Sequence, residues 1–318
     1  MAVYTHLGAE DLARLIARYD VGELVSAKGI AEGISNSNWL IETTRGRFIL
    51  TMYERRIDIG ELPFFLGLLD HLASRGCAVP ATIHDRDGAA SRKVDDKAVA
   101  LIEFLPGVSP TQPSPEQARA VGAALAQIHL AARDYPQTRR NDLTPKDSAT
   151  TLQSHGEDEL ALIDPALPQV RERAADLLER WPEGLPESII HSDLFPDNVL
   201  MLGEEVTGLI DFYFAARDMM AYDLAVTHAA WCFDKTGARF DPAIGQALVA
   251  GYEAVRPLDP VEREALPVLA EGACLRFVAS RAEDWLDTPA DAQVLRKDPM
   301  DFVRRWDFYA EEGARAFA

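Results

Sequence analysis

The chain has 318 residues and a formal net charge of −19, from 51 acidic and 32 basic side chains. This length accommodates two domains, or one domain with two lobes. Such a strong negative charge disfavours nucleic acids and anionic membrane surfaces as partners, because like charges repel. The sequence also lacks the run of about 18 apolar residues that a membrane span requires.

The N-terminus and the cysteines favour a cytoplasmic protein. Acidic residues occur early in the first 20 residues, which is untypical of a signal or transit peptide. The three cysteines, Cys77, Cys232 and Cys274, are odd in number and have no spacing typical of a metal site. We therefore expect a reducing compartment, no disulfide framework and buried thiols.

Apolar periodicity predicts a β-rich N-terminal third. An opening helix carries Leu12, Leu15 and Ile16 on one face. The elements expected after it are a hairpin of strands 38–43 and 47–53, a helix over 59–75, a second hairpin of strands 81–86 and 89–94 around Asp87-Gly88, and a buried strand over 98–105.

The pattern becomes helical after Pro106-Gly107. Ser114-Pro115-Glu116-Gln117 combines an N-cap, a proline at the first helical position and a capping-box glutamine. Further helices are expected at 169–181, 219–234, 241–256, 261–285 and 299–316, with a β interruption over 189–211 and a long loop over 136–160. The sequence therefore predicts an α+β chain with a small β-rich lobe (1–105), which has one main helix, and a larger helical lobe (106–318).

The segment 189–212 carries the most chemistry. It contains His191, Asp193 and Asn198, with Asp211 eighteen residues after Asp193. A short hairpin turning at Gly203-Glu204 would fold Asp211 back beside the other two oxygen-bearing side chains. Hard oxygen ligands of this kind suit Mg²⁺ and a phosphoryl group, and phosphoryl transfer also needs a carboxylate to receive the proton of the attacking hydroxyl.

His191-x-Asp193-x-x-x-x-Asn198, followed by Ile210-Asp211-Phe212, resembles the catalytic loop and metal aspartate of the aminoglycoside phosphotransferase group of protein-kinase-like small-molecule kinases. The resemblance implies a protein-kinase-like bilobal fold, with ATP and Mg²⁺ as cofactors. It implies that Asp193 is the catalytic base and that Asn198 and Asp211 are the Mg²⁺ ligands. His191 would brace the loop, and Asp223 would be a structural hydrogen-bond acceptor.

The same resemblance places the nucleotide in the N-terminal lobe. Ser35, Asn36, Ser37 and Asn38 occupy the position of the phosphate-covering loop, and backbone groups of Glu103 and Leu105 would hydrogen-bond adenine at the interlobe hinge. Serine and asparagine also favour turns, so ordinary turn chemistry is the alternative for the residues of this loop.

Within the group, the resemblance is closest to the bacterial homoserine kinases and runs nearly end to end. It includes Asp193–Leu200, Leu209–Tyr213 and Cys274–Phe277. It implies ATP-dependent phosphorylation of the hydroxyl of L-homoserine, as in threonine biosynthesis, with a small amino alcohol as substrate and with neither nucleic acid nor membrane as a partner. A guanidinium suits the acceptor carboxylate, and Arg276 is the candidate, with Arg281 directed elsewhere. Asp197 and Asp234 are candidates for the ammonium group.

One feature departs from the kinase pattern. Protein kinases carry a lysine on the third strand that contacts nucleotide phosphates and pairs with a glutamate. Here Thr51 stands near that position and no lysine occurs between residues 29 and 92, which leaves Glu61 without this partner. We hypothesise that Mg²⁺ and residues 33–38 neutralise the phosphates, together with Arg47 or Arg55.

Other functions remain open at this stage. The same fold could phosphorylate choline, a thiosugar or an aminoglycoside, or could bind nucleotide without catalysis. His191 and Asp193 could also be metal ligands of a hydrolase, or residues of a purely structural loop. The absence of a second histidine at ligand spacing argues against the hydrolase.

Overall fold

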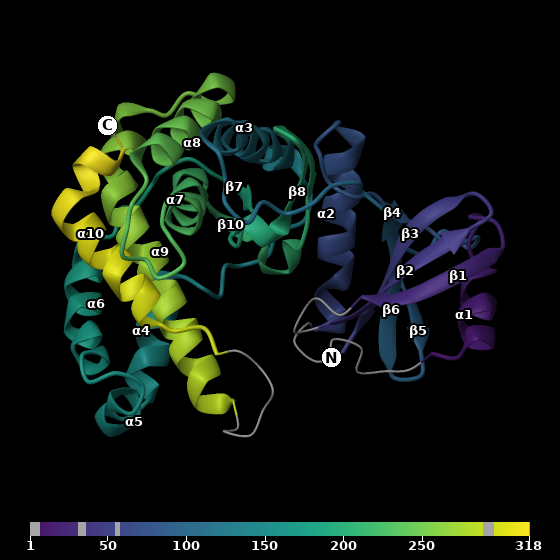
Figure 1. Cartoon of the computed structure of the whole chain (residues 1–318), viewed down its shortest axis with the longest axis horizontal. Coiled ribbons are helices and arrows are strands. Elements are labelled where there is room, and N and C mark those ends of the chain that lie inside the picture. Colours follow the sequence, from purple (N-terminus) through teal and green to yellow (C-terminus); the bar gives the residue numbers. More distant parts are fainter. Residues whose placement is uncertain (1–6, 31–35, 55–57, 289–295, 318) are drawn as a thin grey trace.

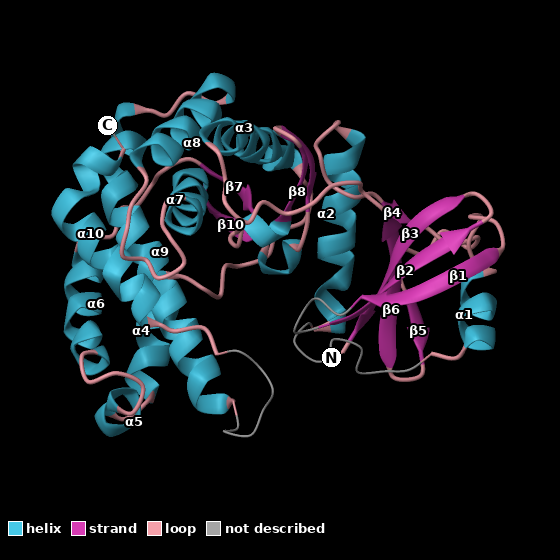
Figure 2. Ribbon diagram, in the orientation of Figure 1, coloured by secondary structure: helices cyan, strands magenta, loops and turns pink. Residues whose placement is uncertain are grey.

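The computed structural model describes residues 7–30, 36–54, 58–288 and 296–317. A β-sheet with a short helix forms one lobe, a group of helices forms the other, and helix α2 stands between them (Figures 1 and 2). This is the predicted α+β, kinase-like arrangement. No helix in the described ranges has both the length and the apolar character to cross a membrane.

The N-lobe is built on one antiparallel sheet. Its strands pair in the order β1-β2-β3-β6-β4, and β5 also pairs with β6. The elements are α1 (Ala9–Ile16), β1 (Leu24–Ile30), β2 (Asn36–Thr43), β3 (Gly46–Tyr53), α2 (Leu62–Ser74), β4 (Thr82–Ile83), β5 (Arg92–Val94) and β6 (Lys97–Glu103). Helix α1 covers one face, where Leu12 and Ile16 pack with Trp39, Leu50 and Val99.

The predicted hairpin of 38–43 and 47–53 is confirmed as β2 and β3, in which Asn38 lies opposite Thr51. The predicted second hairpin is wrong. The turn at Asp87-Gly88 forms, because the Gly88 N–H donates to the Asp85 carbonyl (2.9 Å), but β4 and β5 each pair with β6 and not with each other. Strand β1 was not predicted, because most of its side chains are exposed and it lacks apolar alternation.

Helix α2 joins the two lobes through its apolar side chains. Leu62 and Leu66 pack with Tyr53, Ala98 and Ala100 beneath the sheet. Phe64, Phe65, Leu68, Leu69 and Leu72 belong instead to the core of the C-lobe. Full burial of each such side chain stabilises the fold by about 1.5–3 kcal/mol, so packing holds α2 against both lobes. The predicted division of the chain at residues 105 and 106 stays a prediction, since α2 packs on both sides of it.

The C-lobe contains eight of the described helices and two short β pairs. They are α3 (Pro115–Ala131), α4 (Pro145–Ser154), α5 (Glu157–Ala161), α6 (Val170–Glu179), β7 (Glu187–Ile190), β8 (Val199–Leu202), β9 (Glu205–Leu209), β10 (Ala216–Met219), α7 (Met220–Trp231), α8 (Pro242–Val255), α9 (Pro260–Asp287) and α10 (Met300–Ala316). The predicted capping box is confirmed: the Ser114 side chain accepts from Gln117 N–H, and the Gln117 side chain accepts from Ser114 N–H. The predicted loop over 136–160 is wrong, because α4 and α5 form there. Thr144 caps α4 by accepting from Asp147 N–H, and Pro145 begins the helix.

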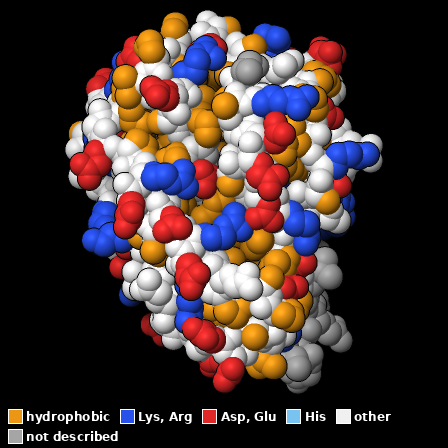
Figure 3. Space-filling model, turned by 90° about the vertical axis from the view of Figure 1, so that its left-hand side faces the viewer, with side chains coloured by type: hydrophobic (Ala, Val, Ile, Leu, Met, Phe, Trp, Pro, Cys, Tyr) orange, Lys and Arg blue, Asp and Glu red, His pale blue; other side chains and the backbone are white. Residues whose placement is uncertain are grey.

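Helix α7 is the centre of the C-lobe, and each of its residues is buried. Around it, α3 packs closely on α8, where a side chain at Gly122 would collide with the Leu248 carbonyl oxygen. Figure 3 views the helical end of the molecule, where acidic and basic side chains are interspersed. On this face the surplus acid is therefore dispersed over the solvated surface.

The buried imidazole of His228, in α7, makes stability depend on pH. His228 Nδ1 lies 2.6 Å from the hydroxyl of Tyr309 in α10, and burial lowers the pKa of His228 to about 3. The folded-state pKa is below the unfolded value of about 6.5, so this contribution is complete above pH 6.5 and is lost as pH falls toward 3.

We expect His228→Asn, which can keep the bond to Tyr309 without titrating, to lose less stability on acidification than the parent protein. The difference between pH 7 and pH 5 should be about 1–2 kcal/mol, from at most about 1.4 kcal/mol per pH unit below 6.5. Urea unfolding at both pH values measures it. Equal losses in the two proteins would show that His228 does not control acid sensitivity.

Candidate active site

A buried carboxylate organises the loop after strand β7. Asp223, in the first turn of α7, accepts hydrogen bonds from His191 N–H (2.7 Å), Ser192 N–H (2.7 Å) and His129 Nε2 (3.0 Å). Burial alone would raise the pKa of Asp223, but the hydrogen bond and charge of His129 and the donors at His191 outweigh it and lower that pKa. The loop is therefore anchored by an ionised side chain inside the core.

His191 braces the loop from the other side. Its ring accepts from Asp193 N–H at Nδ1 (3.2 Å), and Nε2 lies 2.9 Å from the Ile210 carbonyl oxygen. These contacts assign the proton to Nε2, and burial lowers the pKa of His191 so that the ring is neutral. The ring thereby links Ile210, which precedes Asp211, to Asp193.

Asp193 projects from this loop and remains partly open to solvent. Asn198 Nδ2 donates to the Asp193 carbonyl oxygen (2.8 Å) and lies 3.4 Å from Asp193 Oδ2. With its amide nitrogen turned to Asp193, Asn198 presents its amide oxygen as the atom that a cation would meet. The Ile210 N–H donates to the Asn198 carbonyl oxygen (3.0 Å), so the β8–β9 hairpin returns Asp211 to Asn198 as expected.

Two backbone conformations at the site are unusual for residues other than glycine. Ser192 has φ of 69° and Asp211 has φ of 67°, and only Asp95 shares this feature among the described non-glycine residues. Left-handed backbone costs on the order of 1–3 kcal/mol at such residues. It persists here because hydrogen bonds hold both neighbours, His191 and Ile210.

The two carboxyl groups differ in their charged neighbours. Burial raises the pKa of Asp193, whereas Arg276 and Lys297 lower it. For Asp211, burial by the surrounding protein and the negative charges of Asp193 and Asp197 raise the pKa to about 7, although its side chain is reached by solvent. A cation bound at Asp211 would relieve that repulsion.

Arg276, which was predicted to contact an acceptor carboxylate, lies against the catalytic loop itself. Its Nη1 donates to the Ser192 carbonyl oxygen, and Nη2 lies 3.5 Å from Asp193 Oδ1. The side chain is only 3% exposed, and its guanidinium stacks 4.6 Å from the centre of the Phe277 ring. Arg281 points elsewhere and pairs with Asp301 (3.0 Å). The substrate role of Arg276 stays a prediction.

The predicted phosphate loop is only partly described. Ser35 and Arg55 lie outside the described residues, whereas Asn36, Ser37 and Asn38 begin strand β2. Asn36 and Ser37 are buried, and Ser37 Oγ donates to Glu54 Oε1 (2.7 Å). Asn38 Oδ1 accepts from Thr51 Oγ1 (2.8 Å). At the position expected for a strand lysine, Thr51 therefore supplies a hydroxyl that fixes Asn38 of the loop.

The hinge joins the lobes at Glu103 and Leu105. Glu103 N–H donates to the Ala81 carbonyl oxygen (2.9 Å). The N–H and C=O of Leu105 have no hydrogen-bond partner within the described residues, so this peptide is available for a base edge. Arg47 stacks 4.8 Å from the centre of the Phe104 ring and so lies beside the hinge. Its hypothesised contact with phosphate stays a prediction.

Three cations that the sequence analysis did not select lie near the predicted site. Lys97 pairs with Glu54, which also holds Ser37. Lys297 is exposed, and its ammonium lies 5.9 Å from the centre of the Phe195 ring. Phe195 follows Asp193 by two positions in the sequence. Arg139 pairs with Glu61 (2.9 Å), the residue left without a lysine partner. Each is distant in sequence from the residue it approaches, so no local motif indicated it.

Comparison with known proteins places this site in a family. The phosphotransferase enzyme family matches residues 26–258, which include Asp193, Asn198 and Asp211. The chain belongs to this phosphotransferase family. The predicted resemblance to the aminoglycoside phosphotransferase group is thus confirmed, and the protein is a kinase.

Curated relatives of this phosphotransferase cover it almost completely. It is 46% identical over 316 residues to the homoserine kinase of Acidiphilium cryptum, with 99% of each chain covered. It is 47% identical over 309 residues to the homoserine kinase of Gluconobacter oxydans, covering 96% of this chain and 97% of that one.

Solved structures share the fold of the phosphotransferase at low sequence identity. An amicoumacin kinase matches with a TM-score of 0.70 at 13% identity, covering 96% of this chain and 94% of that one. A microcompartment-associated aminopropanol kinase matches with a TM-score of 0.67 at 19% identity, covering 98% and 99%. At these identities the likeness establishes the fold.

The anchoring carboxylate of Asp223 can be tested by removing its charge. In Asp223→Asn, the amide group must face one of three hydrogen-bond donors, so a buried donor loses its acceptor. We expect a loss of about 2–4 kcal/mol in the free energy of unfolding. Urea unfolding measures it, with Glu187→Gln as the control at an exposed acidic residue of β7. Equal stability of Asp223→Asn and the parent would refute the anchoring role.

Proposed function

We propose that this protein transfers the γ-phosphoryl group of ATP to the hydroxyl of L-homoserine, giving O-phospho-L-homoserine and ADP. The convergence of Asp193, Asn198 and Asp211 at the end of β7 supports phosphoryl transfer. End-to-end identity of 44–47% with curated homoserine kinases supports the acceptor. The reaction belongs to threonine biosynthesis, and we place it in the cytoplasm.

Asp193 is the base in this proposal. Its carboxylate accepts the proton of the homoserine hydroxyl while that oxygen bonds to the γ-phosphorus and the bond from phosphorus to the ADP oxygen breaks. Arg276 holds Asp193 through Oδ1 and the preceding carbonyl, and Asn198 approaches Oδ2. The partly open position of the carboxylate leaves room for an acceptor. Orientation of the base by fixed partners reduces the entropy that the reaction must lose.

Asn198 and Asp211 fit a magnesium ion because they supply an amide oxygen and a carboxylate. The described residues contain no group of three or more His, Cys, Asp or Glu side chains arranged around a metal. Phosphate oxygens and water would therefore complete the coordination, which is usual for Mg²⁺ in phosphoryl-transfer sites. The ion would neutralise charge that develops on the phosphoryl oxygens.

We assign the nucleotide to the N-lobe side of this site. Asn36, Ser37 and Asn38, with Ser35 before them, would face the phosphates, and Leu105 would meet the adenine edge together with Glu103. The Thr51–Asn38 hydrogen bond would orient the loop asparagine in place of a strand lysine.

The acceptor carboxylate needs a cation that is not already engaged. Arg276 is nearly fully buried and donates to the catalytic loop, whereas Lys297 is exposed beside Phe195. The positive charge of Lys297 also acts to lower the pKa of Asp193. We therefore favour Lys297 for the carboxylate, and retain Arg276 as the predicted alternative. Asp197 shifts the pKa of Asp211 and is a candidate for the ammonium group, while Asp234 caps a local turn through the N–H groups of Ala238 and Arg239.

An acceptor panel tests the function. Purified protein with Mg-ATP should phosphorylate L-homoserine in preference to choline, serine, threonine and aminoglycosides, as measured by ADP release and by product analysis. Asp193→Asn should lose on the order of 10²–10⁴-fold in kcat while still binding ATP, because it removes the base and little else. Turnover of another acceptor alone would overturn the choice of homoserine, and full activity of Asp193→Asn would remove Asp193 as the base.

Lys297→Met tests the carboxylate contact. Loss of a charged hydrogen bond of about 1.5 kcal/mol should raise the KM for homoserine about tenfold and leave the KM for ATP nearly unchanged. Lys235→Met removes another exposed C-lobe lysine and serves as the control. An unchanged KM for homoserine in Lys297→Met would return the contact to Arg276. In that case kcat and the KM for homoserine should change together in Arg276→Lys.

A further inference from the structure

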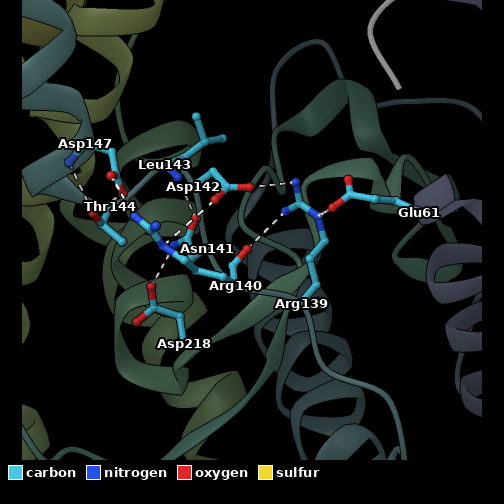
Figure 4. Close-up of polar contacts among 9 residues, drawn as sticks. All are labelled: Glu61, Arg139, Arg140, Asn141, Asp142, Leu143, Thr144, Asp147 and Asp218. Carbon is cyan, nitrogen blue, oxygen red and sulfur yellow. Dashed lines mark hydrogen bonds and ion pairs between the residues drawn. The ribbon is translucent and has the colours of Figure 1, made fainter. Parts of the chain in front are cut away.

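A short segment at the junction of the two lobes, Arg139–Asp142, connects parts of the chain that are distant in sequence. The guanidinium of Arg139 contacts three oxygens: Nε donates to Glu61 Oε1 (2.9 Å), Nη2 to Asp142 Oδ2 (3.0 Å) and Nη1 to the Arg140 carbonyl (3.4 Å). Figure 4 shows this arrangement, in which Glu61 comes from the N-lobe side and the other groups come from the C-lobe. The Arg139 side chain is 17% exposed, so it is held within the junction.

The main chain of the junction segment is bonded to the strands of the catalytic loop. Arg217 N–H, in β10, donates to the Arg139 carbonyl oxygen (2.8 Å), and Asn141 Nδ2 donates to Asp218 Oδ2 (2.6 Å). Strand β10 pairs with β7, where Ala216 lies opposite Ile190, the residue before His191. The backbone of Arg139 therefore moves with the strands that carry Asp193.

The side chain of Arg139 contacts helix α2, through Glu61 at its N-cap and through Phe65, and so reaches the neighbourhood of Asp211. Its guanidinium lies 5.6 Å from the centre of the Phe65 ring, and that ring packs edge-on against Tyr213 at 5.8 Å. Tyr213 lies two residues after Asp211, and its hydroxyl is 2.9 Å from the hydroxyl of Tyr53 at the end of β3. One residue thus contacts the catalytic strands through its backbone and the N-lobe helix through its side chain.

We propose that Arg139 is a positioning residue that fixes helix α2, and with it the nucleotide-holding lobe, relative to Asp193 and Asp211. Burial of apolar side chains holds α2 between the lobes, but it does not specify direction. The Arg139–Glu61 pair supplies a directional constraint at the start of the helix. In protein kinases the corresponding constraint is an ion pair between a strand lysine and a helix glutamate within one lobe. Here the glutamate pairs across the lobes.

A second ion pair between α2 and the C-lobe offers a matched control. At the other end of the helix, Arg75 Nη2 lies 2.5 Å from Asp134 Oδ2, and this pair is more exposed than Arg139–Glu61. Arg75→Met therefore removes a contact between the same helix and the same lobe. It does so at the far end of α2 from Glu61 and Phe65.

The experiment compares Arg139→Met, Arg139→Lys, Glu61→Gln, the double variant Arg139→Met with Glu61→Gln, and Arg75→Met. Binding of Mg·AMP-PNP is measured by calorimetry without an acceptor, and kcat and both KM values are measured with homoserine. Because nucleotide binding is read without an acceptor, a wrong choice of acceptor would not affect this part of the test.

We expect Arg139→Met and Glu61→Gln each to weaken nucleotide binding about tenfold, a magnitude typical of coupling between sites, with a smaller change in the KM for homoserine. The double variant should resemble either single variant, because both remove the same contact. Arg139→Lys should recover part of the loss by restoring the charge, and Arg75→Met should stay within about twofold of the parent.

Two results would overturn the proposal. One is nucleotide binding in Arg139→Met or Glu61→Gln that is as strong as in Arg75→Met. The other is full additivity of the two substitutions, which would mean that they act separately. If Arg139→Met does not fold, the comparison of Glu61→Gln with Arg75→Met still decides, because Glu61→Gln leaves the Arg139 guanidinium in place beside Phe65.

Discussion

The loop that carries Asp193 depends on the buried carboxylate of Asp223. An ionised carboxylate only accepts hydrogen bonds, so it aligns its three donors toward one point in the core. Two of those donors are the consecutive N–H groups of His191 and Ser192. This alignment stabilises the left-handed conformation of Ser192, which directs Asp193 out of the core and toward solvent. A charge that is costly to bury is thus used to fix the direction of the Asp193 side chain.

The backbone before Asp211 is also fixed by hydrogen bonds, in this case at Ile210. The Ile210 N–H is bonded to Asn198 and its C=O to His191, so the strand end is fixed before the chain turns. Tyr213 then packs against Tyr53, at the end of N-lobe strand β3, and against Phe65 of helix α2, which lies between the lobes. The position of Asp211 consequently depends on contacts from both lobes. The relative placement of the lobes is therefore part of the geometry of the site.

Local patterns in the sequence predicted those parts of the fold that rest on local interactions. The capping box at Ser114 and the β2–β3 hairpin involve residues close in the chain, and both form as expected. Thr144-Pro145-x-Asp147 repeats the helix-start pattern seen at Ser114, so helix α4 had a readable signal that the prediction missed. The pairing of β4 and β5 with β6, in contrast, is a choice among distant partners that turn residues do not specify.

The candidate site shows the same difference between contacts that are local in sequence and contacts between distant residues. The spacing from His191 to Asp211 predicted that these residues converge, because one short hairpin brings them together. Arg139 and Glu61 are 78 positions apart, and Arg276 and Asp193 are 83 apart, so only the folded chain reveals that they meet. Arg276 was selected because a guanidinium suits a carboxylate. In the structure, the carboxylate beside it is that of Asp193, within the protein itself.

Two of the many acidic residues of the chain, the aspartates Asp193 and Asp211 of the site, have different charged surroundings. The positive charges of Arg276 and Lys297 favour ionisation of Asp193, although burial is the larger effect and raises its pKa overall. The charged groups that shift the pKa of Asp211 are Asp193 and Asp197, both negative, so its own surroundings oppose ionisation. Environment therefore separates two chemically identical side chains. Under the proposed function, the protein provides positive charge beside Asp193 itself, whereas the counter-charge at Asp211 would arrive with the nucleotide as a bound cation, which would couple ionisation of Asp211 to loading of the site.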